Sequence, residues 1–187
     1  KERGTLETLL TLPVTNFQMI MSKYIAVALF ACATAVLSLA SLGASVLFLV
    51  NSVADEVSGE FAGIDLSMML GWMPVLLLAM IVTALFITAF CMCFCVFAKS
   101  FKEANNYITP VMFFVMFASM VGMLPSAELN YKTALIPVVN VSLLIKQVMA
   151  QQMNLALAGI TIGTNVCYSV LIVWILSKIY DSENVLF

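Results

Sequence analysis

Long apolar stretches alternate with short polar ones along this chain. Four apolar stretches are almost free of charged residues, and each is long enough to cross, as a helix, a hydrocarbon core about 30 Å thick. We expect these spans at residues 16–50, 68–97, 108–124 and 153–180. The pattern therefore predicts an all-α integral membrane protein with four transmembrane helices in a single membrane domain.

The polar stretches predict what lies between and around the spans. Residues 51–67 hold four acidic residues and no basic one, which indicates an exposed loop. Such a loop can attract cations through its field, although exposed acidic loops are usually just solvated. Residues 98–107 form a second loop, and 1–15 and 181–187 are the polar ends of the domain.

The first polar segment, residues 1–15, has the pattern of a short amphipathic helix. Thr5 can cap this helix, whose apolar face is formed by Leu6, Leu9 and Leu10, and Pro13 ends it. An apolar face beside a membrane can dock on a partner protein or lie among lipid headgroups. The pattern leaves both possibilities open.

Residues 125–152 are too polar, and too interrupted by Pro137, to form a fifth span. Asn140 can serve as an N-cap there, and the residues that follow place apolar side chains at helical spacing, at Val141, Leu144, Ile145 and Val148. We expect an external re-entrant or interfacial helix. The alternative is a helix packed on the outer rim of the bundle.

The basic residues indicate the orientation in the membrane. With four spans and a cytoplasmic N-terminus, six of the eight basic residues face the cytoplasm, and Lys132 and Lys146 face outward. This distribution obeys the positive-inside rule. We therefore expect a multi-pass protein of the cell membrane with both ends cytoplasmic, and with residues 51–67 and 125–152 outside.

Composition excludes several kinds of chemistry. The chain has no His, the commonest general base, and no G-x-x-x-x-G-K-[ST] loop to hold ATP phosphates. Its basic residues are scattered, whereas a nucleic-acid site needs them clustered. The five cysteines lie inside apolar runs, where neither disulfides nor a four-ligand metal site is expected. We expect no catalytic residue, no cofactor, no metal and no nucleic-acid partner.

The interiors of the spans are polar only through hydroxyl and amide groups. They contain no Asp, Glu or Arg, whereas carriers driven by ion gradients generally place ionisable groups at mid-membrane. The pattern therefore favours a passive pathway that a separate motor opens. The polar side chains could replace part of the water shell of a cation or bond to their own helix backbone. They are Thr34, Ser38, Ser41, Ser45, Thr83, Thr88, Ser119, Thr161, Thr164 and Asn165.

Gly159 and Gly163 form a G-x-x-x-G pair in the last span. This spacing lets membrane helices approach closely. We expect a contact within the subunit, with dimerisation as the alternative.

Several segments resemble one membrane-protein family. ERGTLETLL (2–10), LPVT (12–15) and SKY (22–24) are similar to the segment between the second and third spans of ABC-2 type permeases, the membrane subunits of many ATP-driven exporters. The resemblance continues in FAKSFKEANN (97–106), similar to the next cytoplasmic loop, in IPVVN (136–140), similar to an external re-entrant element, and in the tail. Together these segments most resemble the sodium-extruding branch.

The resemblance implies a fold, partners and a substrate. The chain would be the C-terminal part of a six-span ABC-2 fold; its start at Lys1 instead of Met, without a signal-peptide pattern, indicates a piece of a longer protein. Two permease chains, identical or different, would work in the bilayer on two ABC ATPase subunits. The exported substrate would be an ion or small molecule, here Na⁺.

The resemblance also implies where the ATPase binds. In the family, the short helix before the third span is a coupling helix that contacts the ATP-binding subunit. The matching positions are Glu2, Arg3, Gly4, Thr5, Leu6, Glu7, Leu9 and Leu10. A second cytoplasmic contact would be formed by Lys99, Lys102 and Glu103.

Two other functions stay open at this point. A drug, a lipid or a peptide suits the 13 Met and 13 Phe residues nearly as well as Na⁺ does. A non-transporting sensor or structural subunit would need a soluble domain outside this sequence, and a membrane enzyme would need a polar cluster with a base.

Overall fold

The computed structural model describes residues 16–53, 66–98 and 100–181, and within these ranges the chain forms helices and no strand. Its long helices are α2 (Asn16–Val53), α3 (Leu66–Cys95), α4 (Phe101–Met120) and α6 (Leu155–Asp181). Between α4 and α6 lie the 3₁₀ turns η1 (Val121–Met123) and η2 (Thr133–Leu135) and the short helix α5 (Val139–Met149).

Four segments of the described helices are long and apolar enough to cross a membrane. They are Met21–Phe48, Gly71–Cys95, Phe101–Met123 and Leu155–Ile179. This confirms the predicted all-α membrane fold with four spans. The shorter α5 does not reach spanning length.

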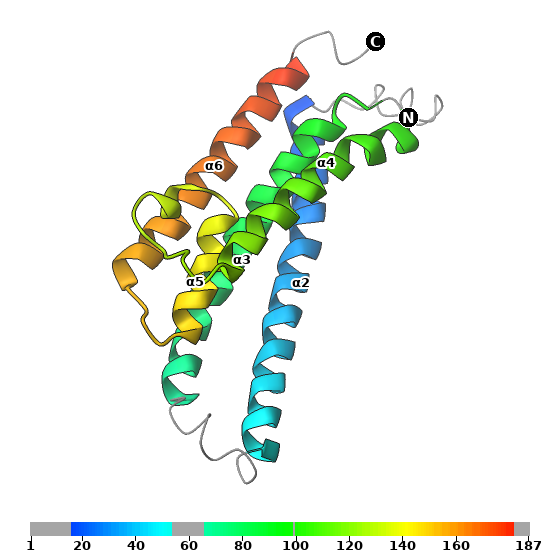
Figure 1. The fold of residues 1–187 in the computed structure, drawn as a ribbon. Helices are drawn as coiled ribbons and strands as arrows, with labels where there is room; N and C mark the ends of the chain where they lie inside the picture. Colours follow the sequence, from blue (N-terminus) through cyan, green and yellow to red (C-terminus); the bar gives the residue numbers. More distant parts are fainter. Residues whose placement is uncertain (1–15, 54–65, 99, 182–187) are drawn as a thin grey trace.

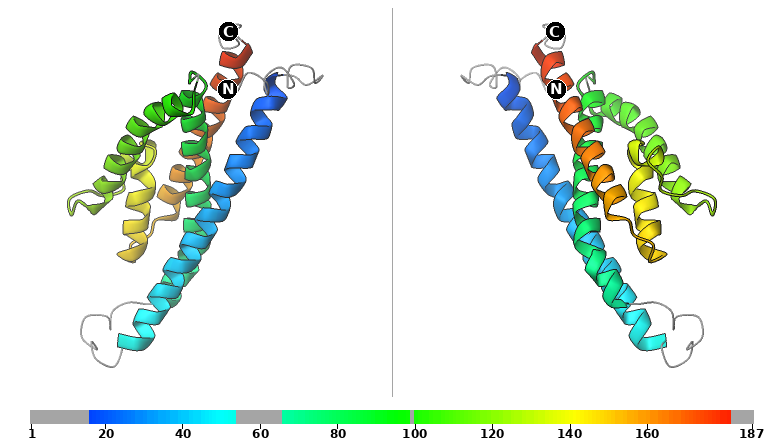
Figure 2. Two further views of the ribbon diagram at one scale, coloured as in Figure 1. Left: turned by 90° about the vertical axis from the view of Figure 1, so that its right-hand side faces the viewer. Right: turned by 90° about the vertical axis from the view of Figure 1, so that its left-hand side faces the viewer.

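Helix α3 is the centre of the bundle, and it packs against α2, α4, α5 and α6. Helix α4 starts beside the end of α3 and slopes away from it, and α5 fills the space between α4 and α3 (Figure 2). The start of α2, the end of α3, the start of α4 and the end of α6 all lie at one end of the bundle (Figure 1). We call this end the N/C end.

The core of the bundle surrounds α5. Leu143 and Leu144 of this helix are fully buried, and they belong to one cluster with Leu76 and Phe86 of α3 and Leu157 of α6. Burying a leucine stabilises the fold by about 1.5–3 kcal/mol. The short helix is thus the part of the chain that joins α3, α4 and α6.

By contrast, the outward faces of α2 and α4 are apolar and exposed. Leu29 and Phe30 of α2 are 66% and 78% exposed, and Phe113 and Phe117 of α4 are also exposed. A contiguous apolar surface of this extent is stable in contact with lipid tails and not with water. The exposed side chains therefore agree with the assignment of these helices as membrane spans.

Helix α4 corrects the expected third span and the loop before it. The helix begins at Phe101, not at Ile108, so most of 98–107 is helical and not a loop. Ser100 is the N-cap, and its hydroxyl accepts a hydrogen bond of 3.3 Å from the backbone N–H of Glu103. Pro110 lies inside this helix, and Pro74 lies inside α3.

Helix α5 corrects the role expected for Asn140. The N-cap residue is Val138, and Asn140 lies inside the first turn with its side chain completely buried. Val138 has a φ of 70°, a strained value for a β-branched residue. The predicted stripe is confirmed, since Val141, Leu144 and Val148 are buried. The helix packs against α3, α4 and α6 with much of its surface buried, which disagrees with the alternative of a rim helix. Its re-entrant or interfacial position in the membrane stays a prediction.

The G-x-x-x-G pair does not make the contact expected within the subunit. A Cβ atom added at Gly159 or at Gly163 would meet no atom within 4 Å in the described part of the chain. The close approach occurs instead at Gly122 of η1, where a Cβ would lie 2.8 Å from the Cβ of Ser142 in α5.

Candidate functional site

The residues predicted to contact an ATPase are mostly outside the described part of the chain. This applies to Glu2, Arg3, Gly4, Thr5, Leu6, Glu7, Leu9, Leu10 and Lys99, and also to the acidic residues of 54–65. Lys102 and Glu103 are described. They lie in the first turn of α4, with Lys102 exposed and Glu103 half-buried. Their position is at the N/C end of the bundle (Figure 1).

A buried polar cluster lies where α3, α5 and α6 meet, and we define it as Thr83, Asn140, Thr164 and Asn165. Asn140 and Asn165 bond to each other twice, because the amide nitrogen of each donates to the oxygen of the other at 3.3 Å. Asn165 also donates to the hydroxyl oxygen of Thr83 at 3.0 Å. Both asparagines are fully buried.

The loop before α5 completes the polar cluster. The backbone carbonyl of Ala134 in η2 accepts hydrogen bonds from Nδ2 of Asn140 at 3.1 Å and from the hydroxyl of Thr164 at 3.0 Å. Tyr168, one turn further along α6, donates to the carbonyl of Leu135 at 3.1 Å. These bonds fix the segment that turns sharply at Val138, and they explain why the first turn of α5 faces α6.

The chemistry open to the polar cluster is that of neutral oxygens and amides. None of its four side chains ionises near neutral pH, so the cluster cannot act as a general base or carry protons. Its oxygens are of the kind that bind hard cations such as Na⁺. In this structure they bond to one another, and each buried polar group that is paired avoids a cost of about 1–3 kcal/mol.

Thr83, Thr164 and Asn165 are among the polar residues predicted inside the spans, and the structure brings these three together with Asn140. Several of the others bond to their own helix, as that interpretation anticipated. Thr34 donates to the carbonyl of Phe30 at 2.7 Å, and Ser45 to that of Ser41 at 2.9 Å. Asn165 could be singled out in the sequence because it is an isolated amide in an apolar run. Nothing in the sequence identified Asn140 as its partner.

The side chain of Lys146 in α5 contacts the segment that follows α4. Its ammonium donates to the backbone carbonyls of Leu124 at 2.6 Å, Pro125 at 3.3 Å and Ala127 at 2.8 Å. These carbonyls follow the end of α4 and η1, where carbonyl groups have no partner within a helix. Lys146 therefore ties α5 to the end of α4.

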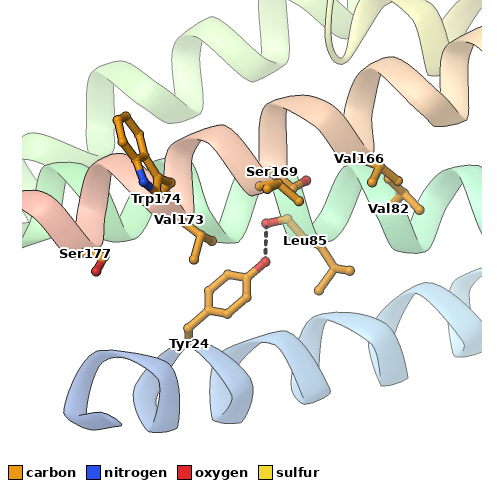
Figure 3. Close-up of a pocket in the computed structure, with 9 residues that line it drawn as sticks. Tyr24, Val82, Leu85, Val166, Ser169, Val173, Trp174 and Ser177 are labelled. Atoms are coloured by element: carbon orange, nitrogen blue, oxygen red, sulfur yellow. Dashed lines mark hydrogen bonds between the residues drawn. The ribbon is translucent and has the colours of Figure 1, made fainter. Parts of the chain in front are cut away.

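An apolar groove lies where α3 and α6 meet, and Tyr24 of α2 forms a wall on its α2 side (Figure 3). Its volume is about 450 Å³. The lining residues, shown in Figure 3, are Tyr24, Val82, Leu85, Val166, Ser169, Val170, Val173, Trp174 and Ser177. The hydroxyl of Tyr24 donates to the carbonyl of Leu85 at 3.2 Å, which ties α2 to α3 (Figure 3). We call this the α3–α6 groove.

Metal ligands do not gather in the described part of the chain. No group of three or more His, Cys, Asp or Glu side chains lies close enough there to hold a metal ion. The cysteines, all within the described ranges, are free thiols. The arrangement therefore offers polar oxygens and apolar grooves, and no built metal centre in those ranges.

Comparison with known proteins gives one match. Residues 1–179 match the family model described as ABC-2 family transporter protein. No curated protein and no solved structure matches the chain.

Proposed function

This chain belongs to the ABC-2 transporter family, and we propose that it is the permease subunit of an exporter driven by a separate ABC ATPase, with Na⁺ as the exported ion. Members of the family are membrane subunits that are not themselves catalytic and that generally work with an ATPase partner. The family membership is the observation that carries the proposal. The finer parts rest on the physical arguments that follow.

The distribution of charged residues supports a membrane pathway that is driven by a separate ATPase subunit. Among the described residues of the four spans, the charged side chains are Lys23, Lys102, Glu103 and Lys178, and each lies near the N/C end. The span within α3 contains no charged residue. Without ionisable groups at mid-membrane, these helices have no built-in means of coupling to a proton gradient.

The N/C end is the side on which we place the ATPase. The proposed coupling residues, Glu2 to Leu10, precede the start of α2 by a few residues in the sequence, and Lys102 and Glu103 lie in the first turn of α4. Both α2 and α4 begin at the N/C end (Figure 1). Leu6, Leu9 and Leu10 would enter a groove on the ATPase, with Glu2, Arg3 and Glu7 at its rim. Movement of the ATPase would then tilt α2. This places both termini in the cytoplasm, in agreement with the positive-inside rule.

The choice of Na⁺ as substrate is supported by the resemblance of the sequence to the sodium-extruding branch and by the chemistry of the polar cluster. Amide and hydroxyl oxygens of Thr83, Asn140 and Asn165 can replace water around a hard cation once α3, α5 and α6 separate. A drug, a lipid or a peptide would use the apolar side chains instead, and remains the second candidate within the family.

A second permease copy is part of the proposal. The exposed pair Gly159 and Gly163 leaves a shallow face on α6 with no atom within 4 Å of an added Cβ in the described residues. Faces of this kind let two membrane helices approach closely. Cross-linking of the purified complex would distinguish a homodimer of this chain from a heterodimer with a related permease.

Co-purification tests the coupling to an ATPase. The double substitution Leu6→Asp and Leu9→Asp places charge on the proposed docking face and should abolish recovery of the ATPase with the permease. Thr8→Asp, on the opposite face of the same segment, is the matched control and should leave recovery intact. An intact complex in the double variant overturns the proposed docking. It would favour a helix that lies among lipid headgroups, or a sensor subunit that binds no motor.

A further inference from the structure

We propose that the α3–α6 groove is a binding site for one acyl chain of an anionic phospholipid, whose phosphate lies beside Lys178. The site is distinct from the polar cluster and from the proposed ATPase contacts. Only the choice of membrane leaflet rests on the proposed function: the lipid lies in the cytoplasmic leaflet if the N/C end is cytoplasmic. The lipid site itself is argued from the geometry of the groove.

The length of the groove matches one leaflet of a bilayer. On α6 its lining runs from Val166 to Ser177, which at 1.5 Å per residue is about 16 Å along the helix axis. Half of a hydrocarbon core of about 30 Å is about 15 Å. A groove of this length, open to the side and ending near Val166, accommodates an acyl chain that enters from the N/C end.

The walls of the groove suit an acyl chain better than another helix. Val170 and Trp174 are 64% and 61% exposed, so they present open apolar surface. The glycine pair of α6 that would suit close packing against another helix, Gly159 and Gly163, lies outside the groove. The hydroxyl of Ser169 donates to the carbonyl of Asn165 at 2.7 Å, so this donor is already used.

The mouth of the groove has the side chains that bind a lipid headgroup. The ammonium of Lys178 lies 4.9 Å from the ring centroid of Trp174, which holds a cation directly beside the lining. Ser177 adds a hydroxyl to the lining. Tyr and Trp are enriched where membrane meets water. Cations at a membrane surface attract anionic lipids, so the mouth favours a negatively charged headgroup.

Tryptophan fluorescence tests this site in the full chain, without an ATPase or a transport assay. The chain has two tryptophans, so Trp72→Phe leaves Trp174 as the only reporter, and Trp174→Phe leaves Trp72. We would reconstitute both variants in phosphatidylcholine vesicles and add phosphatidylglycerol or phosphatidylcholine with brominated acyl chains, which quench nearby indoles. Quenching of Trp174 should saturate at a low fraction of brominated phosphatidylglycerol, while Trp72 follows the bulk lipid.

Two further substitutions separate the groove from its mouth. Val170→Phe fills the groove and should abolish saturable quenching, whereas Leu171→Phe, on an exposed position outside the lining, should not. Lys178→Gln should lower the preference for phosphatidylglycerol about fivefold, and Lys132→Gln should leave it unchanged. The proposal is overturned if quenching of Trp174 rises linearly and equally for both lipids. It is also overturned if bromine never reaches Trp174, because another helix or a second copy would then fill the groove.

Discussion

Asn140 and Asn165 exchange two hydrogen bonds of 3.3 Å at the junction of α3, α5 and α6, and both side chains are shielded completely from the surroundings. This relationship joins the segment between α4 and α6 to the centre of the bundle. Because both side chains are fully buried, neither amide can exchange its partner for water while the helices stay together.

The asparagine pair is expected to stabilise the fold cooperatively. Asn165→Leu should lower the free energy of unfolding by about 1–2 kcal/mol, because Asn140 and Thr83 lose a partner in a site without water. Asn140→Leu should have an effect of similar size. Unfolding in detergent, followed by circular dichroism, measures both.

The double variant is the control for this prediction. Once one asparagine is gone, replacing the second should cost clearly less than it does alone, with a coupling of about 0.5–1.5 kcal/mol. Additive effects of the two substitutions would contradict the interpretation that the amides act as a pair.

Gly122 should tolerate no larger residue. A Cβ at this position would lie 2.8 Å from the Cβ of Ser142 and 3.1 Å from its backbone carbon, so Gly122→Ala forces η1 away from α5 and should cost about 1–3 kcal/mol. Gly71→Ala is the matched control, since a Cβ there meets nothing within 4 Å in the described residues. Equal melting temperatures for the two variants would show that η1 and α5 are not in contact.

Lys146 should be needed for the ordered end of α4. Lys146→Met keeps the length of the side chain but removes the ammonium that binds three backbone carbonyls, and should destabilise the fold by about 1 kcal/mol. Hydrogen exchange should then rise in residues 121–127. Lys132→Met, at an exposed position of the same region, is expected to change neither quantity, and a similar effect of both substitutions would assign the loss to net charge instead.

The proposed orientation predicts which positions an impermeant thiol reagent reaches. In a chain whose five cysteines have been replaced, Lys132→Cys should be labelled in intact cells, and Lys102→Cys only after the membrane is opened, because the orientation with six of the eight basic residues inside places Lys102 in the cytoplasm and Lys132 outside. Both positions are exposed. The opposite labelling pattern would place the N/C end outside and would exclude an ATPase at that end.

The sequence predicted the spans but not the start of every helix. Hydropathy alone located the four spanning segments, because no soluble fold exposes apolar runs of that length. The predicted start of α4 was wrong because Lys102, Glu103, Asn105 and Asn106 make the first two turns polar, so that they resemble a loop. The local signal that was missed is Ser100, whose hydroxyl caps the backbone N–H of Glu103 three residues later.

The polar cluster could be predicted only in part. Asn165 stands out as an amide within an apolar run, and such residues generally have a partner inside the bundle. Asn140 looked like an N-cap because the residue before a helix is often Asn. The strained turn at Val138 moved the helix start and placed the amide inside. Pairing between residues 25 positions apart depends on tertiary packing, which hydropathy and spacing do not encode.

The central claim, that an ATPase drives ions through this membrane domain, is tested most directly by Na⁺ uptake into inside-out vesicles that contain the permease and its ATPase. The account predicts uptake that requires ATP and both subunits and that disappears in the Leu6→Asp, Leu9→Asp variant. Uptake that continues without the ATPase, or a complex that hydrolyses ATP and moves no Na⁺, would contradict it.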